Sequence, residues 1–105
     1  MIARIWRGSA SMAKAEDYHR HFTVNVAPHL KTIPGNVGAY LLKRETGAEV
    51  EFLAVTLWDS LAAIESFAGA DPTVAIVEPE GRATLSYFDD FASHYEVAFQ
   101  AVPNS

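Results

Sequence analysis

The residues best suited to proton-transfer chemistry in this chain are its four histidines. An imidazole titrates near neutral pH, so a positioned histidine can remove a substrate proton as a general base. His21, Asn25 and His29 are spaced four apart and lie on one stripe of a predicted helix. We expect this stripe to border a cavity, with partly buried structural histidines as the alternative. His94 is a second candidate base, and the pattern leaves open which of His21, His29 and His94 faces the cavity.

Metal and phosphate chemistry find little support in the sequence. The chain has no cysteine, so neither a disulfide, a thiolate metal site nor a cysteine nucleophile can form. Asparagine is a rare zinc ligand, and no suitably placed carboxylate completes a tetrahedron with His21, Asn25 and His29. With no metal motif and no glycine-rich phosphate loop, we expect any catalysis to rest on histidines, carboxylates, tyrosines and aromatic walls in a cavity.

Composition limits the partners and the compartment. Half of the 105 residues are apolar, which suits one domain spanning residues 1–105. The net charge of -5 and the lack of a basic cluster longer than Lys43-Arg44 argue against nucleic acid. No apolar run approaches the roughly 20 residues needed to cross a bilayer, and the arginine-containing start does not resemble a signal peptide. We therefore expect a cytoplasmic protein that binds a small, partly apolar molecule.

The first half of the chain predicts a strand, a helix and a hairpin. A β-rich strand over residues 2–7 should end at a Gly-Ser turn, and Ser11 should cap a helix that is kinked by Pro28. Residues 37–44 and 50–58 are two β-rich runs around a glycine-containing loop, which is typical of a β-hairpin.

The second half continues the alternation less clearly. Asp59 or Ser60 should cap a second helix that ends at Gly69. We expect one or two helical turns over residues 72–77, an ambiguous stretch over 81–88 and a last strand over 94–102. This order indicates an α+β fold, a ferredoxin-like βαββαβ protomer with an antiparallel sheet.

The hairpin strands predict a homodimer. Residues 39–42 and 52–55 are apolar on both faces, whereas two helices can cover one face of such a sheet. A second copy of the same sheet would cover the other face. The alternative is that residues 72–77 fold over it.

Several segments together resemble the antibiotic biosynthesis monooxygenase family of dimeric α+β barrels. They are the start Met1–Gly8, the turn Pro34-Gly35-Asn36, Glu51-Phe52-Leu53 with Leu57–Ser60, and His94–Val97. The resemblance implies that two sheets form a barrel across the dimer axis, with a ligand cavity between sheet and helices in each protomer.

The resemblance also implies a cofactor-independent monooxygenase that oxidises a small aromatic substrate, such as a phenol, quinol or polyketide. A base would remove a proton, and the anion would pass an electron to O2 before radical recombination. In that mechanism His21 or His94 would be the base, and Arg4 or Asn25 would stabilise the anion. The aromatic walls that bind the substrate would be Trp6, Phe22, Tyr40, Trp58 and Phe67.

Three other functions are compatible with the same fold. One is a non-catalytic homodimer that binds a small molecule, and another is a ring-rearranging isomerase that consumes no oxygen. Haem degraders of the family pattern carry an Asn in the first strand, a Trp on the second helix and a ligating His after it. This chain lacks all three there, because its second helix offers Phe67 and no histidine lies between Trp58 and His94.

Overall fold

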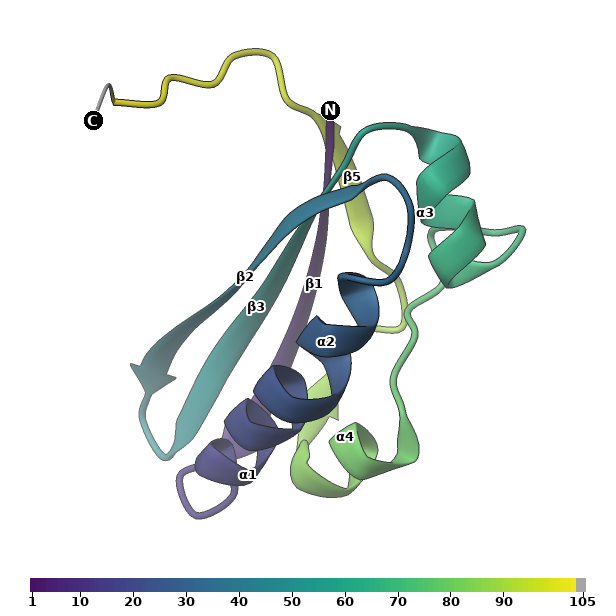
Figure 1. The fold of residues 1–105 in the computed structure, drawn as a ribbon. Helices are drawn as coiled ribbons and strands as arrows, with labels where there is room; N and C mark the ends of the chain where they lie inside the picture. Colours follow the sequence, from purple (N-terminus) through teal and green to yellow (C-terminus); the bar gives the residue numbers. More distant parts are fainter. Residues whose placement is uncertain (104–105) are drawn as a thin grey trace.

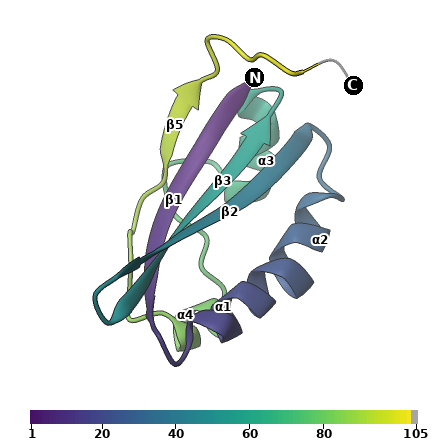
Figure 2. The ribbon, with the colours of Figure 1, turned by 90° about the vertical axis from the view of Figure 1, so that its left-hand side faces the viewer.

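The computed structural model describes residues 1–103 and consists of an antiparallel sheet with helices on one face (Figures 1 and 2). The strand order is β2-β3-β1, and β4 and β5 both pair with the free edge of β1. This is the expected ferredoxin-like α+β arrangement. The strands are β1 Ile2–Ser11, β2 Asn36–Thr46, β3 Glu49–Trp58, β4 Tyr87–Phe88 and β5 Ser93–Glu96.

β1 is longer than the sequence predicted, because Gly8 and Ser9 do not form a turn. The strand pairs with β3 along its whole length, from Ile2 opposite Trp58 onward. A Cβ atom on Gly8 would lie 2.9 Å from Cη2 of Trp6. The glycine therefore makes room for the indole ring inside a strand, and long-range pairing overrides the local turn signal.

The first helix has three parts, α1 Ala15–His21, the π-helical turn η1 Phe22–Val26 and α2 Ala27–Leu30. Ser11 does not cap it, since Lys14 occupies the N-cap position without a side-chain cap. The kink expected at Pro28 takes the form of the π turn, in which the Ala27 N–H donates to the Phe22 carbonyl. A proline ring crowds the carbonyl four residues earlier, and a wider turn relieves that contact.

The second predicted helix is confirmed as α3 Leu61–Ala68. The Ser60 hydroxyl accepts a 3.2 Å hydrogen bond from the Ala63 N–H, as an N-cap does. The helix stops at Gly69, whose φ of 90° favours glycine.

The C-terminal third differs most from expectation. Residues 72–77 are not helical, because the Ala75 N–H donates to the Asp90 carbonyl and the Ala92 N–H donates to the Thr73 carbonyl. The helix forms later, as α4 Pro79–Thr84, with proline in its first turn. The last strand ends at Glu96 rather than at residue 102. We call residues 70–78, the chain between α3 and α4, the strap.

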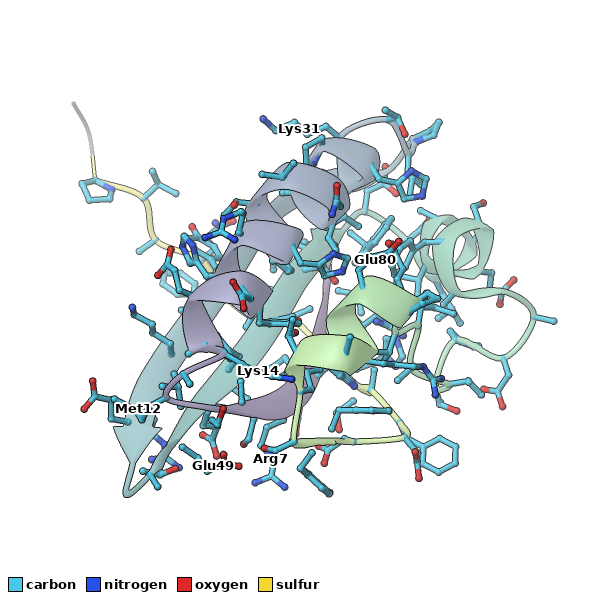
Figure 3. All side chains as sticks on the ribbon, turned by 90° about the horizontal axis from the view of Figure 1, so that it is seen from below. Arg7, Met12, Lys14, Lys31, Glu49 and Glu80 are labelled. Carbon is cyan, nitrogen blue, oxygen red and sulfur yellow. The ribbon has the colours of Figure 1, made fainter. Side chains whose placement is uncertain are left out.

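Contacts from both sides hold α4 and the strap in place. The Lys14 ammonium donates a 3.3 Å hydrogen bond to the Ala83 carbonyl of α4 (Figure 3). An isolated antiparallel bridge joins Val74 of the strap to Phe91. The strap and α4 thus close the side of the molecule that the first helix and α3 leave open.

The core lies between the sheet and the helices, in two clusters. One is centred on Trp6, Tyr18 and Phe52. The other contains Trp58 together with Leu30 and Ile64. No helix among residues 1–103 is long and apolar enough to cross a membrane.

Candidate active site

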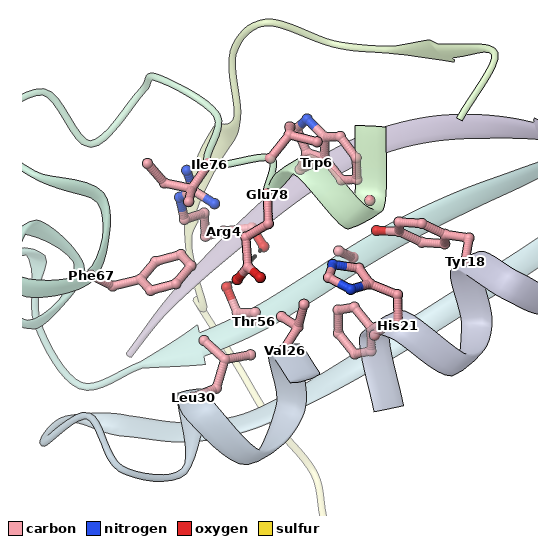
Figure 4. A pocket seen from close by; sticks show the side chains of 14 residues that line it. Arg4, Trp6, Tyr18, His21, Val26, Leu30, Thr56, Phe67, Ile76 and Glu78 are labelled. Atoms are coloured by element: carbon pink, nitrogen blue, oxygen red, sulfur yellow. Dashed lines mark hydrogen bonds between the residues drawn. The ribbon is translucent and has the colours of Figure 1, made fainter. Parts of the chain in front are cut away.

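A cavity of about 60 Å³ lies between the helix-facing side of β1 and β3 and the first helix (Figure 4). Phe67 of α3, the strap and the first residues of α4 close it. Alternation along the strands aims the even-numbered residues of β1 and β3 at this side. The polar or titratable side chains that line it are those of Arg4, Trp6, Tyr18, His21, Thr56 and Glu78.

His21 is held in a defined orientation at the end of α1. Its side chain is buried, and its Nδ1 atom lies 3.1 Å from the Asn25 amide nitrogen. An amide can present either its nitrogen or its oxygen, so Asn25 suits both tautomers of the ring. A Cβ on Gly81 would lie 3.2 Å from Nε2, which shows how closely α4 approaches the imidazole edge. Asn25 itself is exposed and does not line the cavity.

Two carboxylates of the strap and α4 surround the same imidazole. One ligand atom each from His21, Glu78 and Glu80 lie within 4.8 Å of one another. Glu78 projects into the cavity in Figure 4, whereas Glu80 is exposed. Sequence reasoning did not anticipate this group, because His21 is 57 or more residues away from both glutamates in the chain.

Arg4 brings a buried positive charge to the opposite end of the cavity. Its Nη2 atom donates a 3.0 Å hydrogen bond to the Val74 carbonyl of the strap. The guanidinium lies over the Phe67 ring at 5.5 Å from the centroid. Burial lowers the pKa of Arg4, but an arginine remains charged at neutral pH. A charge in this position can stabilise an anion in the cavity.

Tyr18 and Thr56 are cavity residues that the sequence did not single out. Burial raises the pKa of Tyr18, so its phenol stays protonated at neutral pH and can donate a hydrogen bond. The Thr56 hydroxyl accepts a 2.8 Å hydrogen bond from the Trp58 indole nitrogen. Tyr18 belongs both to the core and to the cavity lining.

The predicted aromatic walls divide into two groups. Trp6, Phe22 and Phe67 line the cavity. Trp58 instead lies in the core behind Phe67, with its ring stacked on that ring at 5.6 Å between centroids. Tyr40 is on the other face of the sheet and is 60% exposed, so it is not a wall of this cavity.

The remaining histidines lie outside the cavity lining. His94 is on β5, directly opposite Arg4 in the ladder, and borders a separate surface hollow. His29 is exposed on α2, with its ring 6.5 Å from that of Phe67. Of the three histidines left open by the sequence, the structure thus places His21 in the cavity.

The fold and the cavity define a ferredoxin-like α+β domain with an aromatic-walled site for a small molecule. A model of the antibiotic biosynthesis monooxygenase family matches residues 1–79. The chain therefore belongs to the antibiotic biosynthesis monooxygenase family. None of the curated protein sequences is significantly similar to it.

Several solved structures share the fold over nearly the whole chain. A Bacillus cereus protein ascribed to the same family has 12% identity and a TM-score of 0.70, covering 100% of this chain and 98% of its own. The monooxygenase ActVA-Orf6 of Streptomyces coelicolor, solved with nanaomycin D, has 15% identity and a TM-score of 0.64, covering 98% and 92%. The haem degrader MhuD of Mycobacterium tuberculosis, solved with two haems, has 20% identity and a TM-score of 0.65, covering 97% and 100%. At these identities the likeness shows the fold alone.

Haem does not fit the residues of this cavity. The chain from Trp58 to His94 contains no intervening histidine that could ligate the iron. The cavity of about 60 Å³ would also have to open far more for a porphyrin than for a single aromatic ring.

Proposed function

We propose that this chain is a cytoplasmic, cofactor-independent monooxygenase that oxidises a small phenol, quinol or related aromatic compound. The observation that carries the proposal is the pairing of His21 and Arg4 at two ends of one aromatic-walled cavity. A base at one end and a positive charge at the other are what a substrate needs to lose a proton and be held as an anion.

The chemistry can be written with this chain's own groups. His21 accepts the phenolic or enolic proton, with Glu78 and Glu80 stabilising the imidazolium. The electron-rich anion, held near Arg4, passes one electron to O2, and recombination of the two radicals forms a carbon–oxygen bond. In the resulting peroxide, the attacked ring carbon loses its hydrogen as the O–O bond breaks, so this carbon becomes a carbonyl and the second oxygen atom leaves as water. Atoms and electrons balance without an added reductant.

Substrate entry requires the strap to move. The cavity of about 60 Å³ has room for about two water molecules, which is less than one aromatic ring. The strap is attached to the sheet mainly by the Arg4–Val74 hydrogen bond and by the backbone bonds around Asp90. We propose that displacement of the strap admits the substrate.

Oxygen uptake tests the proposed activity. We expect chelator-treated protein to consume O2 with an anthrone-like phenol or a hydroquinone and to place one atom from 18O2 in the product. The rate should exceed that of the uncatalysed oxidation measured with heat-denatured protein. An uptake equal to that background across the panel, together with stabilisation by the same compounds in thermal unfolding, would indicate a binding protein instead.

The second face of the sheet supports a homodimer as the working form. The helices leave this face uncovered (Figure 2), and it carries partly exposed apolar side chains. Those in the central rows are Ile5, Tyr40, Leu42, Leu53, Val55 and Leu57. Such a patch on three adjacent strands is typical of a protein interface.

We propose a second copy of this chain as the occupant of that face. The same side chains meet themselves across a two-fold axis, so an apolar patch is complementary to its own copy. The ion pairs of Glu51 with Arg7 and Arg44 lie at one end of the face and would form a polar rim. The charge-free centre around Val55 would then be the buried part of the interface.

Replacing Val55 by lysine should convert the dimer to a monomer. Val55 is opposite Ile5 in one ladder and Tyr40 in the other, at the centre of the face. Burying an unpaired ammonium there should weaken association by at least about 100-fold. Sedimentation velocity over a concentration series measures the change. Val24→Lys, which adds the same charge at an exposed position of η1, should remain dimeric, and a monomeric wild type would refute the dimer.

A further inference from the structure

Two buried side-chain nitrogens among residues 1–103 have no hydrogen-bond partner, Nε of Arg4 and Nε2 of His94. They belong to residues that lie directly opposite each other on β1 and β5. Opposed residues on one face of an antiparallel pair have their Cβ atoms about 5 Å apart. The two unpartnered atoms therefore belong to neighbouring side chains, of which Arg4 lines the cavity and His94 borders the adjoining surface hollow.

The charge of Arg4 is also uncompensated. None of the ion pairs found in the described part of the chain includes it. Glu78 lines the same cavity, but toward His21, and does not pair with the guanidinium. Burying an arginine without a carboxylate partner is costly, so such a residue usually has a ligand to bind.

We propose that the substrate of this cavity carries a carboxylate, which pairs with the guanidinium of Arg4 beside His94. The inference rests on the proposed function in taking this cavity as the substrate site, and it specifies that Arg4 holds the substrate anion through a carboxylate, while the proton that His21 removes lies at the other end. It names the aromatic acids, rather than neutral phenols, as the preferred class of ligand.

The contacts of Arg4 explain why a carboxylate suits this position. Phe67 covers one face of the guanidinium, and the Val74 carbonyl takes one N–H of Nη2. The edge of the guanidinium that carries Nε is therefore left to hydrogen-bond to a ligand. A planar carboxylate can accept two parallel hydrogen bonds from a guanidinium edge, which a neutral hydroxyl cannot do.

His94 adds a pH-sensitive reporter of the bound anion. Burial, and then repulsion by Arg4, lower the pKa of His94. The charged groups near it are Arg4 from β1, Asp59 at the end of β3 and Glu96 on its own strand. A carboxylate bound to Arg4 would offset the repulsion and raise the pKa of His94. Acid binding should therefore strengthen as the pH falls through the pKa of His94, because protonation adds a second positive charge.

The test compares 4-hydroxybenzoate with 4-hydroxybenzamide, which have the same shape and differ in charge. We expect the acid to bind at least about tenfold more tightly in calorimetry. In Arg4→Met the acid should bind about 10- to 100-fold more weakly, with the amide changed by less than about threefold. Lys31→Met removes a positive charge from the exposed end of α2 (Figure 3) and should leave both affinities unchanged.

A proton NMR titration of His94 supplies the second readout. The acid should raise the pKa of His94 in the wild type, whereas the amide should not. Arg4→Lys keeps the charge but loses the planar edge, so it should retain part of the preference for the acid. If Arg4→Met does not fold, Arg4→Lys provides the test in its place.

The outcomes separate this inference from the proposed activity. Equal affinity for acid and amide, no binding of the acid, or a preference that persists in folded Arg4→Met would overturn the carboxylate assignment. A preference that depends on Arg4 supports it even if no oxygen is consumed, in which case the proposed activity alone fails. Oxygen uptake that favours neutral phenols over the corresponding acids would support the proposed activity and overturn the carboxylate assignment.

Discussion

Exchanging His21 for glutamine is expected to lower oxygen uptake by about 10²- to 10⁴-fold, the range for loss of a general base. Glutamine keeps a polar side chain of similar reach and can hydrogen-bond to Asn25, but it cannot accept the substrate proton. The rate should be measured at saturating substrate, with the same phenol or hydroquinone that the wild type oxidises. An unchanged rate would remove His21 from the mechanism.

Two variants show whether that loss is specific to the base. His29→Gln makes the same change on the same helical stripe, but at an exposed residue outside the cavity, and should leave uptake within about twofold of the wild type. Asn25→Ala removes the amide that orients the imidazole and should lower uptake less than His21→Gln does. As a positioning residue, Asn25 should be partly replaceable by serine, whose hydroxyl can donate to or accept from Nδ1 of His21.

Replacing Trp58 by alanine is expected to lower the free energy of unfolding by about 3–5 kcal/mol. Its side chain is fully buried, stacks on Phe67 and donates its indole N–H to Thr56. The truncation leaves a large hole between sheet and α3, and it also removes the partner of a buried hydroxyl. Urea unfolding at one fixed protein concentration measures the change, because association would make the apparent stability concentration-dependent.

The matched variant Trp58→Phe separates the ring from its hydrogen bond. Phenylalanine keeps most of the stacking on Phe67 and should cost about 1 kcal/mol, the usual value of one buried hydrogen bond. Because Trp58 lies behind the cavity wall, this variant should keep oxygen uptake within a few-fold of the wild type. A large loss of activity at nearly full stability would mean that the indole contacts substrate after all.

Much of the fold follows from short-range patterns. Two β-rich runs around a glycine-containing loop predicted the hairpin, and a serine before an apolar stretch predicted α3. These features depend on a few neighbouring residues, so they can be predicted from the sequence alone. The kink at Pro28 was predicted for the same reason, although only the structure shows that it becomes a π turn.

The misassigned segments share a different cause. Gly8 reads locally as a turn and residues 72–77 as a helix, yet both are extended because their backbones bond to residues far along the chain. Once the strap is extended, the next proline begins α4 instead of ending a helix. Long-range hydrogen bonds determine the conformation of these segments, and the bonding partners lie far outside the neighbouring sequence from which a local prediction is made.

The sequence indicated which residue types could form a site, but not which residues the fold brings together in it. His21 and His94 were candidate bases because of their imidazoles, and the family resemblance proposed Arg4 or Asn25 as the anion stabiliser and Trp6, Phe22 and Phe67 among the aromatic walls. Tyr40 was misplaced because the hairpin is apolar on both faces, so its pattern does not tell the cavity side from the open side. Tertiary structure alone brought Glu78 to His21 and placed His94 opposite Arg4. Those pairs arise from the crossing of separate elements, which depends on how the whole chain packs.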